Sequence, residues 1–89
     1  MVIERKLTVG NQAGIHLRVA SQIVKLLSEF DCEVEIAFDG RIANAKSIMS
    51  ITQLMAPPGS VLTMRASGNG AAGAVIALEK LFNSKFGEG

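Results

Sequence analysis

The chain has 89 residues, of which 48% are hydrophobic, and nine basic against eight acidic side chains give a formal net charge of +1. A chain this short forms one domain with a modest core, so residues 1–89 are expected to be a single domain with no cofactor. The near-neutral charge and the lack of Trp and Tyr disfavour nucleic acid as a partner.

One cysteine, Cys32, and one histidine, His16, leave no disulfide and no clustered set of metal ligands in this sequence. Cys32 lies in an alternating apolar pattern and is expected to be a buried thiol. The charged start VIERK at residues 2–6 is unlike a signal peptide, and no apolar run approaches the ~20 residues of a membrane span. We therefore expect a cytoplasmic monomer that does not contact a membrane.

The first third of the chain changes from a strand pattern to a helix pattern. Residues 2–9 predict a strand with Ile3, Leu7 and Val9 on one face. A glycine-containing loop follows, and from residue 17 to about residue 30 the apolar side chains recur with the period of a helix. They are Val19, Ala20, Ile23, Val24, Leu26, Leu27 and Phe30.

The remaining elements are bounded by turn signals. CEVEIAF at 32–38 predicts a strand, Asp39-Gly40 predicts a tight hairpin, and residues 41–45 predict the partner strand. Residues 46–55 predict a short helix with Ser47 as N-cap, which ends before the two prolines at 57 and 58. Residues 60–67 alternate as a fourth strand, and residues 71 to about 85 form a last helix.

The order is therefore β-α-β-β-α-β-α. Four strands that are each apolar on one side, together with three amphipathic helices, indicate an α+β fold in which helices pack on one face of a largely antiparallel sheet.

One glycine-rich motif matches part of the pattern of a nucleotide-binding site. GNGAAG at residues 68–73 matches the G-x-G-x-x-G fingerprint between a strand and a helix. Only 16 residues follow it, however, which leaves no room for the second parallel strand and the acidic ribose ligand of a dinucleotide site. The glycines are therefore expected to serve a tight turn that needs positive φ.

The single histidine is the stronger candidate for a site. His16 lies at or beside the predicted N-cap of the helix from residue 17, where free N–H groups and the helix dipole attract anions. The same field disfavours imidazolium, so the neutral ring is available as a nucleophile. Arg18 offers a planar cation that suits phosphate. A lone histidine on a surface loop is the competing interpretation.

Three short motifs together carry a family resemblance. They are GIHLRVA at 14–20, KSIM at 46–49 and ASG at 66–68. With the element order and length, they make the whole chain resemble the histidine-containing phosphocarrier protein (HPr) family of the bacterial phosphotransferase system. The resemblance implies an open-faced β-sandwich: a four-stranded antiparallel sheet with three helices on one face.

The resemblance also implies a function. By this resemblance, His16 would accept a phosphoryl group on Nδ1 from phosphorylated Enzyme I, which takes it from phosphoenolpyruvate. His16 would then pass the group to the A domain of an Enzyme II for sugar uptake. Arg18 would hold the phosphate, and Ser47 would be the target of a regulatory serine kinase. Such a protein is a carrier rather than an enzyme with turnover of its own.

The apolar residues near these motifs predict a docking surface. On the helix after Ser47, Ile48, Ile51, Leu54 and Met55 share one face, whereas Met49 points away from it. Leu17 lies at the border of its own apolar face. We expect partner proteins to cover Leu17, Ile48 and Met49.

The chain departs from the family pattern in two places, and two alternative functions also fit the sequence. The family usually has alanine and proline where this chain has Leu17 and Val19, and the last helix lacks the acidic first turn of many relatives. One alternative is a regulatory relative that signals by binding partners without moving sugar. The other is a small interaction module, which would not need the pair of His16 and Arg18.

Overall fold

The computed structural model describes residues 2–88. The strands in this range are β1 (Val2–Thr8), β2 (Glu33–Phe38), β3 (Arg41–Asn44) and β4 (Val61–Ser67). The helices are α1 (Leu17–Leu27), α2 (Ile48–Thr52) and α3 (Ala71–Asn83), and a 3₁₀ turn covers Lys85–Gly87. The predicted order of elements is confirmed.

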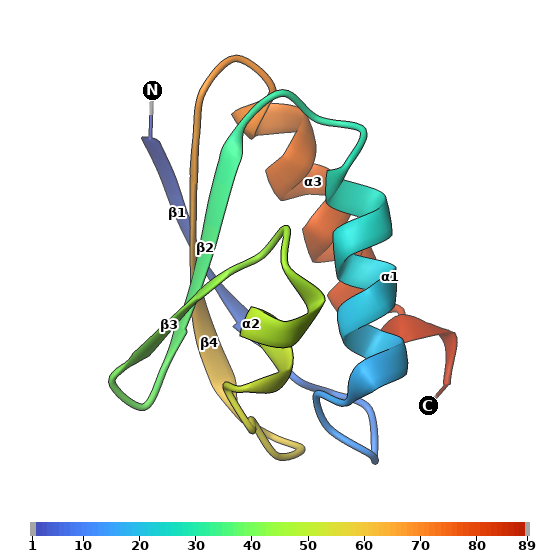
Figure 1. Ribbon diagram of the computed structural model, residues 1–89. Helices are drawn as coiled ribbons and strands as arrows, with labels where there is room; N and C mark the ends of the chain where they lie inside the picture. The colour runs from blue at the N-terminus through green and yellow to red at the C-terminus, as the bar shows by residue number, and fades with distance from the viewer. Residues whose placement is uncertain (1, 89) are drawn as a thin grey trace.

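The four strands form one antiparallel sheet in the order β1-β4-β2-β3. Leu7 of β1 pairs with Leu62 of β4, and Met64 of β4 pairs with Ile36 of β2. Figure 1 shows all three helices on one side of this sheet, while its other side is open. The predicted fold class, a one-sided sheet covered by helices, is therefore confirmed.

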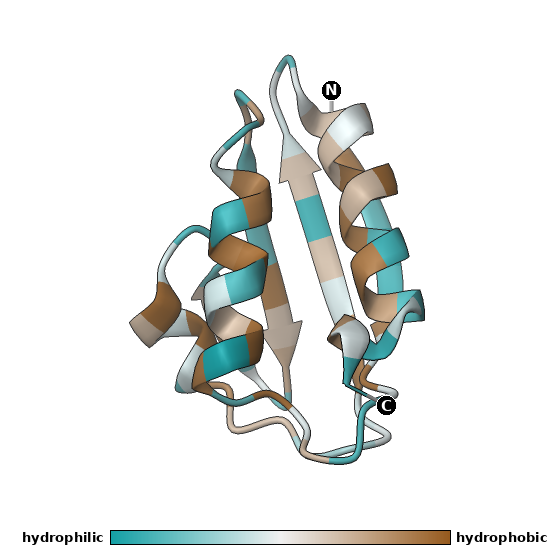
Figure 2. Cartoon of the chain, turned by 90° about the vertical axis from the view of Figure 1, so that its right-hand side faces the viewer, coloured by the Kyte–Doolittle hydropathy of each residue, from teal (hydrophilic) through white to brown (hydrophobic). Residues whose placement is uncertain are grey.

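The core lies between the sheet and the helices. The strand and helix periodicities of the sequence explain which side chains fill it. Alternate residues of each strand and every third or fourth residue of each helix point inward. Figure 2 shows hydrophobic residues recurring at intervals along the helices. The predicted thiol of Cys32 is buried at one end of this core. The largest fully buried apolar side chains are Ile23, Leu27, Ile36, Ile51, Leu54, Leu62, Met64, Leu78, Val9 and Val19.

The turns have the conformations that their residues favour. Asp39 and Gly40 have φ values of 52° and 78°, as a two-residue hairpin with two left-handed positions requires. In GNGAAG, Gly68 has φ of 117°, and a Cβ on Gly73 would lie 2.9 Å from the ring of Phe30. Gly68 serves the predicted turn, whereas Gly73 permits a close approach of Phe30 that the sequence did not indicate.

Two helices are shorter than predicted. α1 ends at Leu27 instead of residue 30, because the hydroxyl of Ser28 donates to the carbonyl of Lys25 and the following N–H groups bond three residues back. α2 ends at Thr52, so the helical face predicted for residues 48–55 does not extend to Met55. Met55 has φ of 54° and is 73% exposed, which corrects its predicted place on the buried face.

None of the helices within residues 2–88 is long and apolar enough to cross a membrane.

Candidate functional site

His16 is the N-cap residue of α1, as predicted. Its backbone is extended, with φ of −134° and ψ of −177°, and its carbonyl accepts the N–H of Ala20 at 2.9 Å. Its Nδ1 atom accepts the N–H of Arg18 at 3.3 Å. Nδ1 therefore faces the first turn of α1, where the N–H groups of the next residues have no carbonyl partner within the helix.

The loop before His16 is held against the segment that follows α2. Gly14 has φ of 73°, and a Cβ at this position would lie 2.9 Å from the carbonyl oxygen of Ala56. The N–H of Ile15 donates to that same oxygen at 3.0 Å, and the Ile15 side chain is buried. Because only glycine combines this conformation with this approach, Gly14 determines how the chain enters the helix.

The second ring nitrogen of His16 contacts a residue that the sequence did not indicate. Nε2 lies 3.0 Å from Oε1 of Glu88, at the far end of the chain. The other carboxylate oxygen, Oε2, lies 3.9 Å from Nη1 of Arg18. Glu88 thus joins the two predicted site residues, and its own side chain is only 17% exposed.

Asn11 holds Glu88 in this position. Asn11 is completely buried, and its Nδ2 donates to Oε1 of Glu88 at 2.8 Å and to the carbonyl of Gly14 at 2.9 Å. Both partners are acceptors, so the amide nitrogen must be the atom that faces them. The Oδ1 atom of Asn11 is buried without a hydrogen-bond partner among the described residues.

The segment after α3 brings Glu88 to the site. Lys85 and Phe86 both have left-handed backbones, with φ of 55° and 56°, and they turn the chain back toward the start of α1 (Figure 1). Phe86 is buried, and its ring centroid lies 4.7 Å from that of Phe82 in an edge-to-face arrangement. A left-handed phenylalanine is strained, and the burial of its ring offsets that strain.

The surroundings of Glu88 favour its ionised form. The hydrogen bond from His16 lowers the pKa of the Glu88 carboxyl below its usual value, and the hydrogen bond from Asn11 lowers it further. Partial burial opposes this shift, while the charge of Arg18 adds to it. Glu88 is therefore a carboxylate at neutral pH, and it can only accept hydrogen bonds.

The arrangement suits an anion bound at Nδ1. The start of α1 offers N–H donors and the positive end of a dipole, and the guanidinium of Arg18 is 73% exposed and free to turn. No group of three or more acidic, histidine or cysteine side chains that would suit a metal ion is found within residues 2–88.

Comparison with known proteins decides the family. Residues 3–84 match the family model described as the PTS HPr component phosphorylation site. The chain belongs to the HPr family. It is 37% identical over 87 residues to the phosphocarrier protein HPr of Xylella fastidiosa, with 98% of each chain covered.

Two further relatives of this HPr-family chain extend the comparison. A crystal structure of HPr-C-His from Thermoanaerobacter tengcongensis superposes with a TM-score of 0.92 at 36% identity, with 98% of each chain covered. The phosphocarrier protein NPr of Shewanella violacea is 34% identical over 86 residues, which are 97% of this chain and 94% of the relative. The fold expected from the family resemblance is thus confirmed.

The other predicted residues of this HPr-family chain lie on α2 and the start of α1. The hydroxyl of Ser47 accepts the N–H of Ser50 at 3.3 Å, so Ser47 is the predicted N-cap of α2. Leu17 and Met49 are 67% and 71% exposed, and Ile48 is 37% exposed. These three residues lie on α1 and α2, which pack against each other; we call them the apolar patch.

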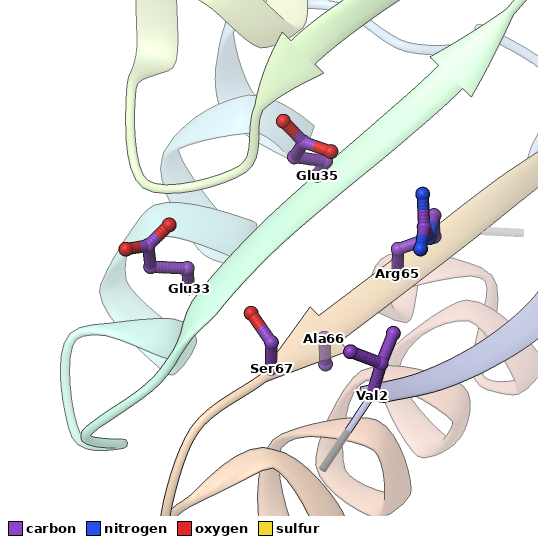
Figure 3. Close-up of a pocket in the computed structure, with 6 residues that line it drawn as sticks. All are labelled: Val2, Glu33, Glu35, Arg65, Ala66 and Ser67. Atoms are coloured by element: carbon purple, nitrogen blue, oxygen red, sulfur yellow. The ribbon is translucent and has the colours of Figure 1, made fainter.

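The open face of the sheet holds a separate shallow pocket. Figure 3 shows Glu33 and Glu35 of β2 and Arg65 of β4 on this face. The pocket is lined by Val2, Glu33, Glu35, Arg65, Ala66 and Ser67, and it contains none of the predicted site residues.

Proposed function

We propose that this HPr-family chain accepts a phosphoryl group on Nδ1 of His16 from phosphorylated Enzyme I and passes it to Enzyme II A domains for sugar uptake. The observation that carries this proposal is the place of the imidazole. Nδ1 faces the free N–H groups at the start of α1, with Arg18 beside it, while Nε2 is occupied by Glu88. Because Nε2 is paired with a carboxylate, which repels an anionic donor, we assign Nδ1 as the phosphoryl acceptor.

The transfer is a displacement at phosphorus. The Nδ1 lone pair attacks the phosphorus atom, an N–P bond forms, and the bond to the donor breaks with its electron pair staying on the donor. The phosphoryl oxygens then replace Nδ1 as acceptors of the helix N–H groups. Transfer to the next acceptor is the reverse, so the site needs to stabilise the phosphoryl group only moderately.

The direct test is to incubate the protein with phosphoenolpyruvate and Enzyme I and to record ³¹P NMR spectra. A phosphohistidine resonance that disappears on addition of an Enzyme II A domain is the expected result. If no phosphohistidine forms with Enzyme I or with its paralogue, the chain is an interaction module and the proposal is wrong.

Arg18→Ala should slow phosphoryl uptake about tenfold, which corresponds to about 1.4 kcal/mol of transition-state stabilisation. The guanidinium would pair with the developing charge on the phosphoryl oxygens, but its exposure to water weakens the pairing. The measurement is rapid-quench uptake from phosphorylated Enzyme I. Arg65→Ala, on the open face of the sheet, is the matched control; equal rates in both variants would remove Arg18 from the site.

Met49→Glu should weaken the binding of Enzyme I at least tenfold, or by about 1.4 kcal/mol, without changing the melting temperature. The side chain of Met49 is exposed on α2, so a partner that covers the apolar patch would have to bury the new charge. Titration calorimetry measures the affinity. Ile76→Glu replaces an apolar residue on α3 that is also exposed, at 57% against 71% for Met49, and should bind normally. Unchanged binding by Met49→Glu would contradict the patch.

Ser47 is proposed as the site of regulatory phosphorylation by a serine kinase. A phosphate at the start of α2 is compatible with the helix dipole, so its effect would fall on partners that cover Ile48 and Met49. Incubation with the kinase and mass spectrometry of the peptide that contains Ser47 would detect this modification.

The family membership leaves one alternative function, because NPr proteins are also among the relatives. In that alternative the chain takes phosphate from a paralogous Enzyme I and signals by binding targets. A comparison of the rates with which the two kinds of Enzyme I phosphorylate His16 would separate the branches. In either case we propose that the carrier is a monomer, since one chain supplies every side chain of the proposed site. We also propose that it is located in the cytoplasm.

A further inference from the structure

We propose that Asn44 is a positioning residue for partner docking: it holds the short helix α2 in the orientation in which Ile48 and Met49 face solvent. Asn44 is the last residue of β3. The inference rests on the proposed function, because α2 carries two of the docking residues of that proposal.

The helix α2 is too short to be stable by itself. It has five residues, Ile48–Thr52, whereas isolated helices shorter than ~12 residues are marginal in water. Among these five residues only Ile51 is buried, so the side chains of α2 anchor it to the core at one point. Hydrogen bonds from neighbouring elements therefore decide how firmly α2 is held.

Asn44 makes three hydrogen bonds to the segment that begins α2. Its Oδ1 atom accepts the N–H of Lys46 at 2.9 Å, which closes a tight turn before the helix. Its carbonyl accepts the N–H of Ser47 at 3.0 Å, and its own N–H donates to the hydroxyl of Ser50 at 2.9 Å. The hydroxyl of Ser47 accepts the N–H of Ser50, so Asn44 and the two serines form a closed set of hydrogen bonds.

Other hydrogen bonds hold the ends of the same segment. Arg41, the first residue of β3, donates from Nη1 to the carbonyl of Leu54 at 3.3 Å, beyond the end of α2. Lys46 donates from Nζ to the carbonyl of Phe30 at 2.7 Å, in the turn that follows α1. Asn44 is the residue that joins the first turn of α2 to the sheet.

Loss of the Asn44 side chain should affect docking rather than the chemistry at phosphorus. None of its hydrogen bonds involves His16 or Arg18. The residue is exposed, so truncation of its side chain leaves no cavity in the core. A partner that binds a loosely held α2 has to order it, and that cost weakens binding.

The test compares steady-state phosphoryl uptake from Enzyme I by the parent protein and by variants of Asn44. Asn44→Ala should raise the KM for the carrier about fivefold, the effect of one lost helix-capping contact, and leave kcat unchanged. Asn44→Ser keeps an oxygen acceptor without placing a charge opposite Glu35, and its KM should lie between the other two. Val75→Ala destabilises the core from α3 and should keep the parent KM.

Two further measurements do not require Enzyme I. The N–H of Ile51, which donates to the carbonyl of Ser47 at 3.1 Å, should exchange with deuterium about fivefold faster in Asn44→Ala. Phosphorylation of His16 by phosphoramidate, a small chemical donor that needs no docking surface, should proceed at the parent rate in this variant.

A parent KM for Asn44→Ala, or parent exchange at Ile51, would overturn the inference. So would a fall in kcat at unchanged KM, or slower phosphorylation by phosphoramidate, since either would place the effect on the chemistry. If Enzyme I fails to phosphorylate the parent protein, the proposed function is wrong, and the exchange of Ile51 then decides whether Asn44 holds α2.

Discussion

His16→Ala should take up no phosphoryl group from Enzyme I while the protein remains folded. The chain contains no other imidazole, so no second residue replaces the nucleophile. The side chain also caps α1 through its contact with the N–H of Arg18, and loss of an N-cap costs about 1 kcal/mol. For a domain of this size that corresponds to a fall in melting temperature of about 4–8 °C.

His16→Asn separates the two roles of this residue. Asparagine is a preferred N-cap, so this variant should melt close to the parent and yet accept no phosphate. Uptake is measured by ³¹P NMR after incubation with phosphoenolpyruvate and Enzyme I, and stability by thermal melting. An acid-labile phosphate that persists in either variant would show that the phosphoryl group is carried elsewhere.

Among the variants described here, Phe86→Ala should cause the largest loss of stability, about 3–5 kcal/mol in the free energy of unfolding. The variant removes a buried ring and its edge-to-face contact with Phe82. Relief of the left-handed backbone at Phe86 offsets part of this loss, by about 1 kcal/mol. Urea unfolding at neutral pH provides the measurement.

The same variant should also release Glu88 from His16, because the segment that carries Glu88 loses its anchor. Hydrolysis of phosphorylated Phe86→Ala, followed as loss of the ³¹P resonance, should therefore depend on pH differently from hydrolysis of the phosphorylated parent protein. Phe86→Leu keeps an apolar side chain in the core, and it should retain most of the stability and the parent profile. If Phe86→Ala loses less than about 1 kcal/mol, Phe86 does not anchor this segment.

The positions of His16 and Ser47 at helix starts were predictable because capping is a local effect. An N-cap depends on the residue itself and on the two or three N–H groups that follow it, all within one turn of sequence. The hairpin at Asp39-Gly40 was predictable for the same reason, since two left-handed positions favour this pair of residues. The exposure of Leu17 and Met49 followed from helical periodicity.

Local reasoning was wrong where a helix ended earlier than its apolar pattern. Met55 continues the spacing of Ile48 and Ile51, yet α2 ends at Thr52 and the chain turns with Met55 in a left-handed conformation. The pattern specifies which side chains are apolar but not the residue at which the helix stops. After Thr52 the N–H groups of Leu54 and Met55 bond three residues back, and the segment that follows packs its Ala56 carbonyl and Pro58 against Gly14.

The sequence by itself determined the fold class and the helix cap at His16, the residue proposed as the nucleophile, because each depends on residues that are close together in the chain. Only the tertiary structure placed Glu88 and Asn11 at the site. Their hydrogen bonds span 72 and 77 positions, and no periodicity or motif connects residues that far apart. Glu88 reaches His16 because burial of Phe86 holds two residues in a strained backbone, and that balance exists only once the core has formed.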